Sequence, residues 1–490
     1  MSNFEALTNI YTGALDVQSV AGLYARLHGE LIFPGMANYD TARAVWNGMI
    51  DKRPALIVRC ADESDVVTAV NFAREHNMLL AVRGGGHNVA GSAVCDGGLV
   101  IDLSSMRRID VDPVSRTARA QGGVTWAELD SETQKFGLAA PGGVVSETGI
   151  AGLTLGGGLG WLRRKYGLTI DSLISVEIVT ADGRFLNASE TENADLFWAV
   201  RGGGGNFGVV TSFEYRLHNV GPEVMFAFVL YPAEIAREAL RFYRDYCASA
   251  PDEVSSFAIF GTVPEAPLFP KEAHGANYIL FAACYAGSVR EGRRILQPLR
   301  EFSTPIADLS APMAFTEVQT ILDEDYPSGE MRYYWKSSYV NSLDDDVIEA
   351  LIAHNAQRPA PHSTVDIWQL GGAMSRVTAE ATAFGDRSAP FLIGVESNWH
   401  HAEDDTQNIA WVRNFVAGMA HFSNGSQYLN FPGLYEEGDA MMRAAFGKNY
   451  ARLAHIKRKY DPTNLFRLNQ NIQPEENRAT AIEYLNPSFM

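Results

Sequence analysis

Three glycine clusters and one histidine are the residues of this sequence best placed to do chemistry. The clusters lie at 84–86, 156–158 and 202–205, and His87 directly follows the first of them. Glycine lets a backbone approach a ligand closely, and successive backbone N–H groups at such turns can cradle phosphates. Each cluster lies between sequence signals for a strand and for a helix. A phosphate-bearing ligand explains this arrangement better than three unrelated tight turns do.

His87 lies where such a ligand would meet the protein. It stands in the run Arg83-Gly84-Gly85-Gly86-His87-Asn88, which follows an apolar stretch expected to form a strand. Arg83 can offset phosphate charge, and Asn88 can add a donor or an acceptor. A neutral imidazole nitrogen is a competent nucleophile toward an activated methyl group, so His87 is a candidate for covalent attachment of a cofactor.

A second interpretation concerns Gly156-Gly157-Gly158-Leu159-Gly160, which loosely matches a dinucleotide fingerprint. That fingerprint requires a preceding strand and an acidic residue about 20 residues later. Residues 149–155 make a poor strand, so a nicotinamide dinucleotide is the less favoured ligand.

Candidate proton acceptors lie further along the chain. Asp366 stands in a run whose pattern predicts a strand at 364–370. If Asp366 faces a cofactor, alternation places Trp368 on the same face and Gln369 on the other; a solvent-facing carboxylate is the competing interpretation. The other candidate bases are tyrosines: Tyr334, Tyr339 and Tyr428.

The elements that position these residues fall into three parts. We expect an N-terminal part at 1–219, a middle domain at 220–440 and a C-terminal segment at 441–490. The first part alternates short strands with helices, including a capping box that begins at Thr125. The second part is richer in aromatic residues and predicts an α+β domain with one antiparallel sheet. Its expected strands lie at 225–230, 278–284, 332–340, 364–370 and 391–396. The last part contains a helix and the polar run Asn469-Gln470-Asn471.

Bulk composition limits the possible functions. A chain of 490 residues predicts more than one domain, and a net charge of −18 disfavours nucleic-acid and membrane partners. The four cysteines show no metal or disulfide spacing, and the charged run at 400–405 reads as a loop, so we expect no metal. The N-terminus lacks a signal-peptide pattern, which favours a cytoplasmic location. The oligomeric state is left open.

Six runs in order carry a family resemblance: VRGGGHNVAG at 82–91, DGGLVIDLS at 96–104, QGGVTWAEL at 121–129, GIAGLTLGGGLGWLRRKYGLTIDSL at 149–173, DLFWAVRGGGGNFGVVT at 195–211 and KRKYDPTNLFRLNQNI at 457–472. On these runs the chain is identified as a member of the FAD-linked oxidase family of vanillyl-alcohol oxidase type, in its berberine-bridge-like branch. That branch includes enzymes of 6-hydroxy-D-nicotine oxidase type and flavin-N5-oxide oxygenases of polyketide pathways.

The resemblance implies a two-subdomain, PCMH-type FAD-binding domain, completed by the C-terminal segment. It also implies a substrate domain whose antiparallel sheet, covered by helices, lies over the flavin. His87 would form a covalent bond to FAD. The other residues that the resemblance places at the cofactor are Arg83, Gly84, Gly85, Gly86, Asn88, Thr148, Gly149, Gly152, Gly156, Gly158, Gly160, Val210, Asn469 and Asn471.

Three departures from the family pattern refine the expected function. Val145 stands where many members carry a second, cysteinyl flavin link, so we expect a single link. Phe431 replaces the final tyrosine of the Tyr-x-Asn-Tyr motif of sugar oxidases, and Ala140 matches the oxygen-pocket threonine of the N5-oxide enzymes. The favoured function is an oxidase that passes hydride from a small alcohol, amine or activated C–H substrate to FAD and reduces O₂ to H₂O₂. Asp366 would be its base and Tyr428 would orient the substrate, with Tyr334 as an alternative base. An N5-oxide monooxygenase and a non-catalytic flavin-binding protein are the alternatives.

Overall fold

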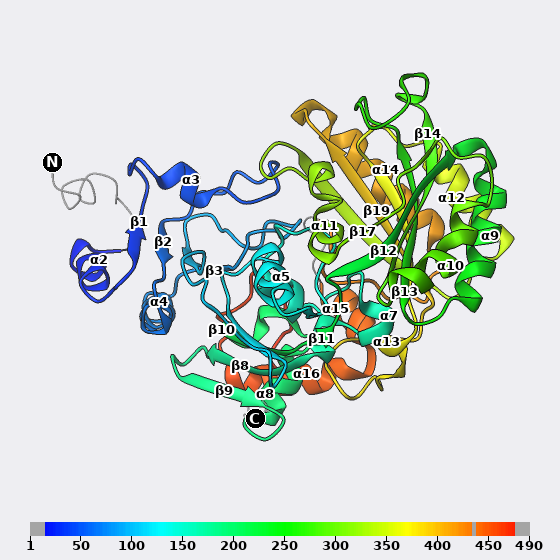
Figure 1. The fold of residues 1–490 in the computed structure, drawn as a ribbon. Coiled ribbons are helices and arrows are strands. Elements are labelled where there is room, and N and C mark those ends of the chain that lie inside the picture. Colours follow the sequence, from blue (N-terminus) through cyan, green and yellow to red (C-terminus); the bar gives the residue numbers. More distant parts are fainter. Residues whose placement is uncertain (1–14, 434–437, 476–490) are drawn as a thin grey trace, which may run out of the picture.

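The computed structural model describes residues 15–433 and 438–475. They form a four-stranded, a five-stranded and an eight-stranded sheet, a two-stranded pair and the surrounding helices (Figure 1). The first half of the chain supplies the two smaller sheets, and the middle supplies the large one. None of the described helices is long and apolar enough to cross a membrane.

The four-stranded sheet positions the glycine run before His87. Its order is β1–β2–β4–β3, and β2, β3 and β4 run parallel. β3 ends at Arg83, so residues 84–86 leave the sheet at the carboxyl edge that β3 shares with β4. The strands are β1 (Glu30–Ile32), β2 (Leu56–Arg59), β3 (Leu80–Arg83) and β4 (Leu99–Asp102), with helices α2 (Val17–Tyr24), α3 (Tyr39–Arg43) and α4 (Glu63–Glu75).

The five-stranded sheet is antiparallel, with the order β5–β6–β10–β8–β9. Helix α4 contacts both β4 and β8 and so lies between the first two sheets. The predicted capping box is confirmed: the Thr125 hydroxyl accepts the N–H of Glu128, whose carboxylate accepts the N–H of Thr125. The strands are β5 (Ile109–Asp112), β6 (Thr117–Gln121), β8 (Leu173–Val179), β9 (Phe185–Ser189) and β10 (Val209–Arg216). The two-stranded pair is β7 (Leu138–Ala139) with β11 (His218–Asn219), and the helices are α5 (Trp126–Gln134), α6 (Ile150–Leu155), α7 (Arg163–Tyr166) and α8 (Ala194–Val200).

The C-terminal segment packs on this first half. Helices α15 (Asp439–Phe446) and α16 (Tyr450–Tyr460) share an apolar cluster with α8. The Asn206 amide donates to the Gln470 carbonyl (3.0 Å) and its oxygen accepts the N–H of Ile472 (3.0 Å). These contacts support the domain division at 219 and 441, which stays a prediction.

The large sheet has the order β15–β12–β14–β13–β18–β19–β17, with β16 also paired to β12. All five strands predicted in this region are present. Three further strands, β13, β15 and β16, were not predicted; in β13 both faces are buried, so its residues show no polar–apolar alternation. The strands are β12 (Glu223–Pro232), β13 (Val254–Thr262), β14 (Asn277–Tyr285), β15 (Ala307–Asp308), β16 (Ala311–Ala314), β17 (Arg332–Val340), β18 (Thr364–Gln369) and β19 (Phe391–Trp399).

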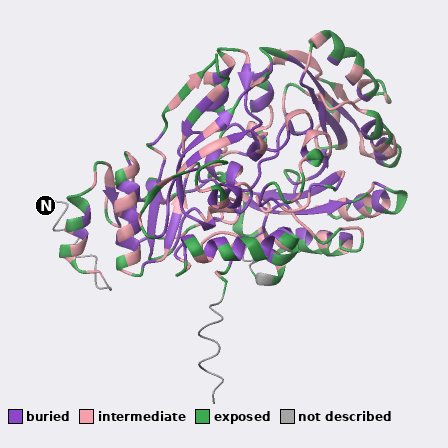
Figure 2. Ribbon diagram, turned by 90° about the horizontal axis from the view of Figure 1, so that it is seen from below, coloured by how far each residue is buried: buried purple, intermediate pink, exposed green. Residues whose placement is uncertain are grey.

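One face of the large sheet is covered by helices, and the other is turned toward the first half of the chain. Side chains of α9, α12 and α14 share an apolar cluster with the outer face, whereas the inner face packs on residues such as Trp161 and Leu168. Figure 2 shows the buried residues gathered in the strands and the exposed residues on the outer faces of the helices. The helices are α9 (Ala236–Ser249), α10 (Val289–Arg300), α11 (Phe315–Thr320), α12 (Asp345–Asn355), α13 (Ala373–Arg376) and α14 (Asp405–Met419).

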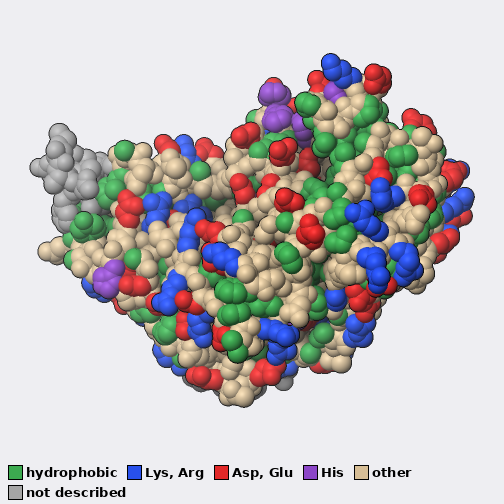
Figure 3. Space-filling view, viewed as in Figure 1, with side chains coloured by type: hydrophobic (Ala, Val, Ile, Leu, Met, Phe, Trp, Pro, Cys, Tyr) green, Lys and Arg blue, Asp and Glu red, His purple; other side chains and the backbone are tan. Residues whose placement is uncertain are grey.

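The surface carries both signs of charge. On the face shown in Figure 3, Lys and Arg side chains are interspersed with Asp and Glu. This face offers no continuous basic patch for a polyanion.

Candidate active site

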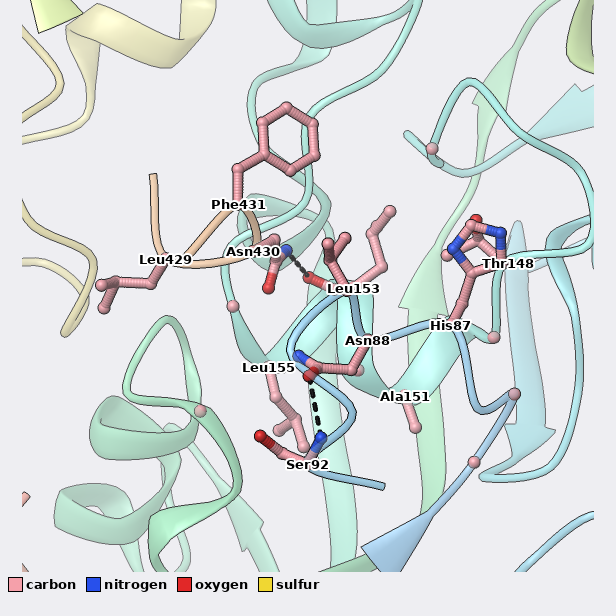
Figure 4. Close-up of a pocket in the computed structure, with 18 of the residues that line it drawn as sticks. His87, Asn88, Ser92, Thr148, Ala151, Leu153, Leu155, Leu429, Asn430 and Phe431 are labelled. Atoms are coloured by element: carbon pink, nitrogen blue, oxygen red, sulfur yellow. Dashed lines mark hydrogen bonds between the residues drawn. The ribbon is translucent and has the colours of Figure 1, made fainter. Parts of the chain in front are cut away.

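A cavity lies between the glycine loops of the first half and the inner face of the large sheet. Asn88, Thr148 and Asn430 line it, and Figure 4 shows them around the loop that carries His87. The structure brings most of the predicted cofactor residues to this one cavity. They are Gly84, Gly85, Gly86, His87, Asn88, Thr148, Gly149, Gly152, Gly156, Val210 and Asn469.

His87 is held as a half-buried, neutral imidazole. Burial lowers its pKa to about 4, so the ring carries no charge at neutral pH. The ring stacks on Trp46, with the ring centroids 4.1 Å apart, and its buried Nε2 has no hydrogen-bond partner among the described residues. A buried polar atom without a partner is unusual. A neutral imidazole with an unpartnered nitrogen, on a residue that lines the cavity, suits nucleophilic attachment of a cofactor.

The glycines provide the space that a cofactor needs. A Cβ built on Gly152 or Gly205 would meet no atom within 4 Å, although both residues line the cavity. A side chain at either position would therefore project into open space in the cavity. Gly156 acts differently, because a Cβ there would lie 2.0 Å from Oδ1 of Asn430. The free space beside these glycines, together with the polar side chains of Asn88, Thr148 and Asn469, fits an extended, phosphate-bearing cofactor.

Four of the predicted cofactor residues lie outside the lining of this cavity. The Arg83 guanidinium is buried against Asp102 and also donates to the carbonyl of Ala44 (3.1 Å), so it holds the chain that precedes His87 rather than a phosphate. Gly158 and Gly160 are packed against Thr169 and against the carbonyl of Gly142. These three residues, like Asn471, do not line the cavity.

Asp366 faces the cavity, as the alternation of β18 predicts. Trp368 shares this face, while Gln369 points to the other side, where its Oε1 accepts a hydrogen bond from the Ser256 hydroxyl (2.7 Å) and its Nε2 donates to the Cys247 carbonyl (3.1 Å). Asp366 is buried, and burial raises the pKa of its carboxyl to about 7. One of its carboxyl oxygens, Oδ1, has no partner among the described residues. A solvent-facing carboxylate is thus the wrong interpretation.

Of the three tyrosine candidates, only Tyr428 is among the described residues that line this cavity; Tyr334 and Tyr339 are not. Tyr428 lines the cavity, and its hydroxyl accepts a hydrogen bond from the Asn430 amide (2.8 Å). Burial raises the pKa of Tyr428 to about 12, so it keeps its proton. Tyr334 lies on the opposite face of β17, in the cluster under the helices, and its hydroxyl accepts from Arg413 (3.0 Å). The structure therefore contradicts Tyr334 as a base in this cavity.

Sequence reasoning missed a second carboxyl, Glu396 on β19. It lines the cavity and accepts a hydrogen bond from the Tyr326 hydroxyl (2.8 Å). Burial, reinforced by the nearby Asp366, raises the pKa of Glu396 well above its usual range. The signal was present, because a glutamate stands inside the apolar run 391–399 where alternation favours a buried side chain.

Comparisons with known proteins agree with this geometry. The family model "FAD binding domain" matches residues 54–189, and the model "Berberine and berberine like" matches residues 427–473. An FAD-linked oxidoreductase of Dictyostelium discoideum is 32% identical, with 88% of this chain and 91% of that protein covered. The (R)-6-hydroxynicotine oxidase of Paenarthrobacter nicotinovorans is 31% identical over 92% of this chain and 97% of its own.

The chain belongs to the berberine-bridge-like family of FAD-linked oxidases. The fold agrees: the crystal structure of 6-hydroxy-D-nicotine oxidase from Arthrobacter nicotinovorans matches with a TM-score of 0.83 at 29% identity. The match covers 92% of this chain and 98% of that one. This berberine-bridge-like protein is therefore an FAD-linked oxidoreductase with the PCMH-type fold.

The positions where this berberine-bridge-like oxidase departs from the family pattern are also placed by the structure. Val145 and Phe431 line the cavity, whereas Ala140 is buried outside its lining. The four cysteines are free and buried, and none of them is among the described residues that line the cavity. The described part of the cavity lining therefore offers no thiol.

Proposed function

We propose that this chain is an oxidase that removes a hydride and a proton from a small, largely apolar or aromatic substrate, an alcohol, an amine or an activated C–H compound. His87 would hold FAD by a single covalent bond. The observation that carries the proposal is that one cavity contains both the unpartnered His87 nitrogen and the buried Asp366 carboxyl.

The cofactor end of the cavity is suited to FAD. The free space beside Gly152 and Gly205, with Asn88 and Asn469 nearby, would accept the extended cofactor, and Trp46 fixes the orientation of His87. When bound, FAD supplies the hydride acceptor and the centre that O₂ reoxidises to give H₂O₂. Every other step belongs to side chains of the protein.

The substrate end is suited to proton removal. Asp366 would accept the substrate proton, and Tyr428, which keeps its own proton, would donate a hydrogen bond that orients the substrate. Trp335, Trp368 and Phe431 would enclose an apolar or aromatic substrate. Asp366 and Tyr428 are both buried, and a low-dielectric setting strengthens such interactions.

The test is anaerobic mixing of the flavin-loaded protein with a library of alcohols, amines and activated C–H compounds. Loss of flavin absorbance identifies a substrate, and readmission of O₂ should then yield one H₂O₂ for each substrate oxidised. Incorporation of ¹⁸O into product without stoichiometric H₂O₂ would instead establish a monooxygenase. A flavin that no compound reduces would establish a binding protein.

Two further proposals concern the partners of this protein and its cellular location. The partners are a small-molecule substrate and O₂. The four free, buried cysteines support a cytoplasmic location, where thiols stay reduced.

A further inference from the structure

The substrate end of the cavity has an unusual charge composition. It contains two carboxyls, Asp366 and Glu396, and none of the described residues that line the cavity is a Lys or an Arg. A third carboxyl, Asp325, lies close enough to disfavour ionisation of Asp366. The buried Arg163 guanidinium lies outside the lining and donates to three backbone carbonyls. The carboxyls thus have no cationic partner among the described side chains.

The register of the sheet makes the two carboxyls converge. Asp366 on β18 lies opposite Gly394 on β19, and Glu396 is two residues further along β19 on the same face. A Cβ built on Gly394 would lie 3.4 Å from Oε1 of Glu396 and 3.6 Å from the Cβ of Asp366. Both side chains therefore border the space above Gly394. Glycine at this position leaves that space open.

Aromatic rings wall the same space. Trp335 on β17 is the direct cross-strand neighbour of Glu396, and its indole N–H is fixed by Asn398 (2.7 Å). The Phe431 ring lies 5.4 Å from the Trp335 ring and 6.1 Å from the Trp368 ring, measured between centroids. The face of an aromatic ring attracts a cation, most strongly where water is excluded. Carboxyls and ring faces together form an ammonium-binding environment.

We propose that the substrate end of this cavity binds a cationic amine, with its ammonium group between Glu396 and Asp366 and against the rings of Trp335 and Trp368. This inference rests on the proposed oxidase function and names the class of substrate. The bound ammonium group would transfer one proton to a carboxylate: an N–H bond breaks, an O–H bond forms, and the nitrogen regains the lone pair that hydride loss from the adjacent carbon requires.

The energetics favour a cation over a neutral substrate. An unpaired carboxylate in a buried site is costly, so with a neutral ligand the two carboxyls hold their protons near neutral pH. A protonated carboxyl cannot act as a base. An ammonium ion provides the missing countercharge, lowers the pKa of both carboxyls and thereby produces the proton acceptor when the substrate arrives.

The experiment measures binding rather than turnover. The flavin-loaded protein is titrated with benzyltrimethylammonium, which has no nitrogen lone pair and cannot be oxidised as an amine, and with its neutral isostere (2,2-dimethylpropyl)benzene. Calorimetry and perturbation of the flavin spectrum report affinity. We expect the cation to bind at least about tenfold more tightly in the wild type, and its affinity to rise with pH as the carboxyls ionise, while that of the neutral compound stays constant.

Variants assign the preference to the carboxyls. Glu396→Gln and Asp366→Asn should each weaken cation binding about tenfold or more and leave the neutral compound unaffected. Glu349→Gln, which removes one negative charge from the exposed face of α12, should change neither affinity. Equal affinity for the two compounds in the wild type, or a charge preference that survives in both cavity variants, would overturn the proposal. If a variant does not fold, the pH dependence in the wild type decides alone.

The outcome is distinguishable from failure of the oxidase proposal. Charge-selective binding with no flavin reduction by any amine would leave the ammonium site standing and reject oxidation. Flavin reduction by a neutral alcohol without charge-selective binding would support the oxidase proposal and reject the ammonium site.

Discussion

Trp46 and His87 form a stacked pair, with ring centroids 4.1 Å apart and ring planes 20° apart. Trp46 is itself stacked on Tyr333 of β17, at 3.7 Å, and its indole N–H donates to the Tyr326 carbonyl (2.9 Å). The imidazole that the cofactor would meet is therefore oriented from the large sheet as well as from its own loop. This relationship links the two halves of the molecule at the proposed attachment point.

Replacing Trp46 should impair attachment of the flavin. In Trp46→Leu the His87 ring loses its stacking partner and can rotate, so we expect a lower fraction of flavin to remain with acid-precipitated protein. Trp46→Phe keeps an aromatic face and should retain most of it. Equal covalent flavin in the wild type and in Trp46→Leu would show that stacking does not orient His87.

Replacing His87 should abolish the covalent bond to the cofactor. The wild-type acid precipitate should be yellow, and the flavin should map to the peptide that contains His87. His87→Ala should release free FAD on precipitation, because none of the described cavity-lining residues is a cysteine. A cysteinyl flavin peptide, or a yellow precipitate from His87→Ala, would contradict the single link.

Asp366→Asn should slow substrate oxidation while leaving the flavin attached. An amide cannot take the substrate proton, so anaerobic flavin reduction should slow by ~10²-fold or more. Because burial raises the pKa of Asp366 to about 7 in the free protein, the wild-type reduction rate at subsaturating substrate should rise with pH through about 7. This step should vanish in the variant. Unchanged kinetics would move the assignment to Glu396.

Gly152→Leu should block the cofactor site. The side chain would extend into the free space on the cavity side of α6, so the purified variant should contain little flavin while keeping its helical circular dichroism. Gly22→Leu is the matched control, because Gly22 is an exposed helical glycine with equally open surroundings. Full flavin content in Gly152→Leu would show that the cofactor lies elsewhere.

Asp130 should make stability depend on pH. Burial raises the pKa of this carboxyl from 3.8 to about 7, with Gln319 as its hydrogen-bond partner. The folded state therefore binds the proton more tightly than the unfolded chain does. Stability from this group is present below pH 4 and is lost as pH rises through about 7, by up to about 4 kcal/mol.

Denaturant unfolding of the wild type and of Asp130→Asn across pH 4 to 8 measures this effect. The amide does not titrate, so the free energy of unfolding should decline less with pH in the variant. Parallel curves for the two proteins would contradict the assignment to Asp130.

The sequence predicted the elements and many of the residues at the cofactor end. Glycine runs beside strands, the capping box at Thr125 and the alternation that places Asp366 with Trp368 are local properties, which neighbouring residues set through backbone freedom and side-chain period. For the same reason, the five strands recognised in the middle of the chain all occur in the large sheet.

Tertiary structure decided what these residues meet. Arg83 looked free to bind phosphate, but Asp102 on the neighbouring parallel strand takes its guanidinium. Tyr334 looked like a base, but the pleat of β17 turns it toward the helices. Glu396 becomes the neighbour of Asp366 only through the pairing of β18 with β19. Contacts between strands depend on register, and register is a property of the assembled sheet that no single segment of the sequence determines.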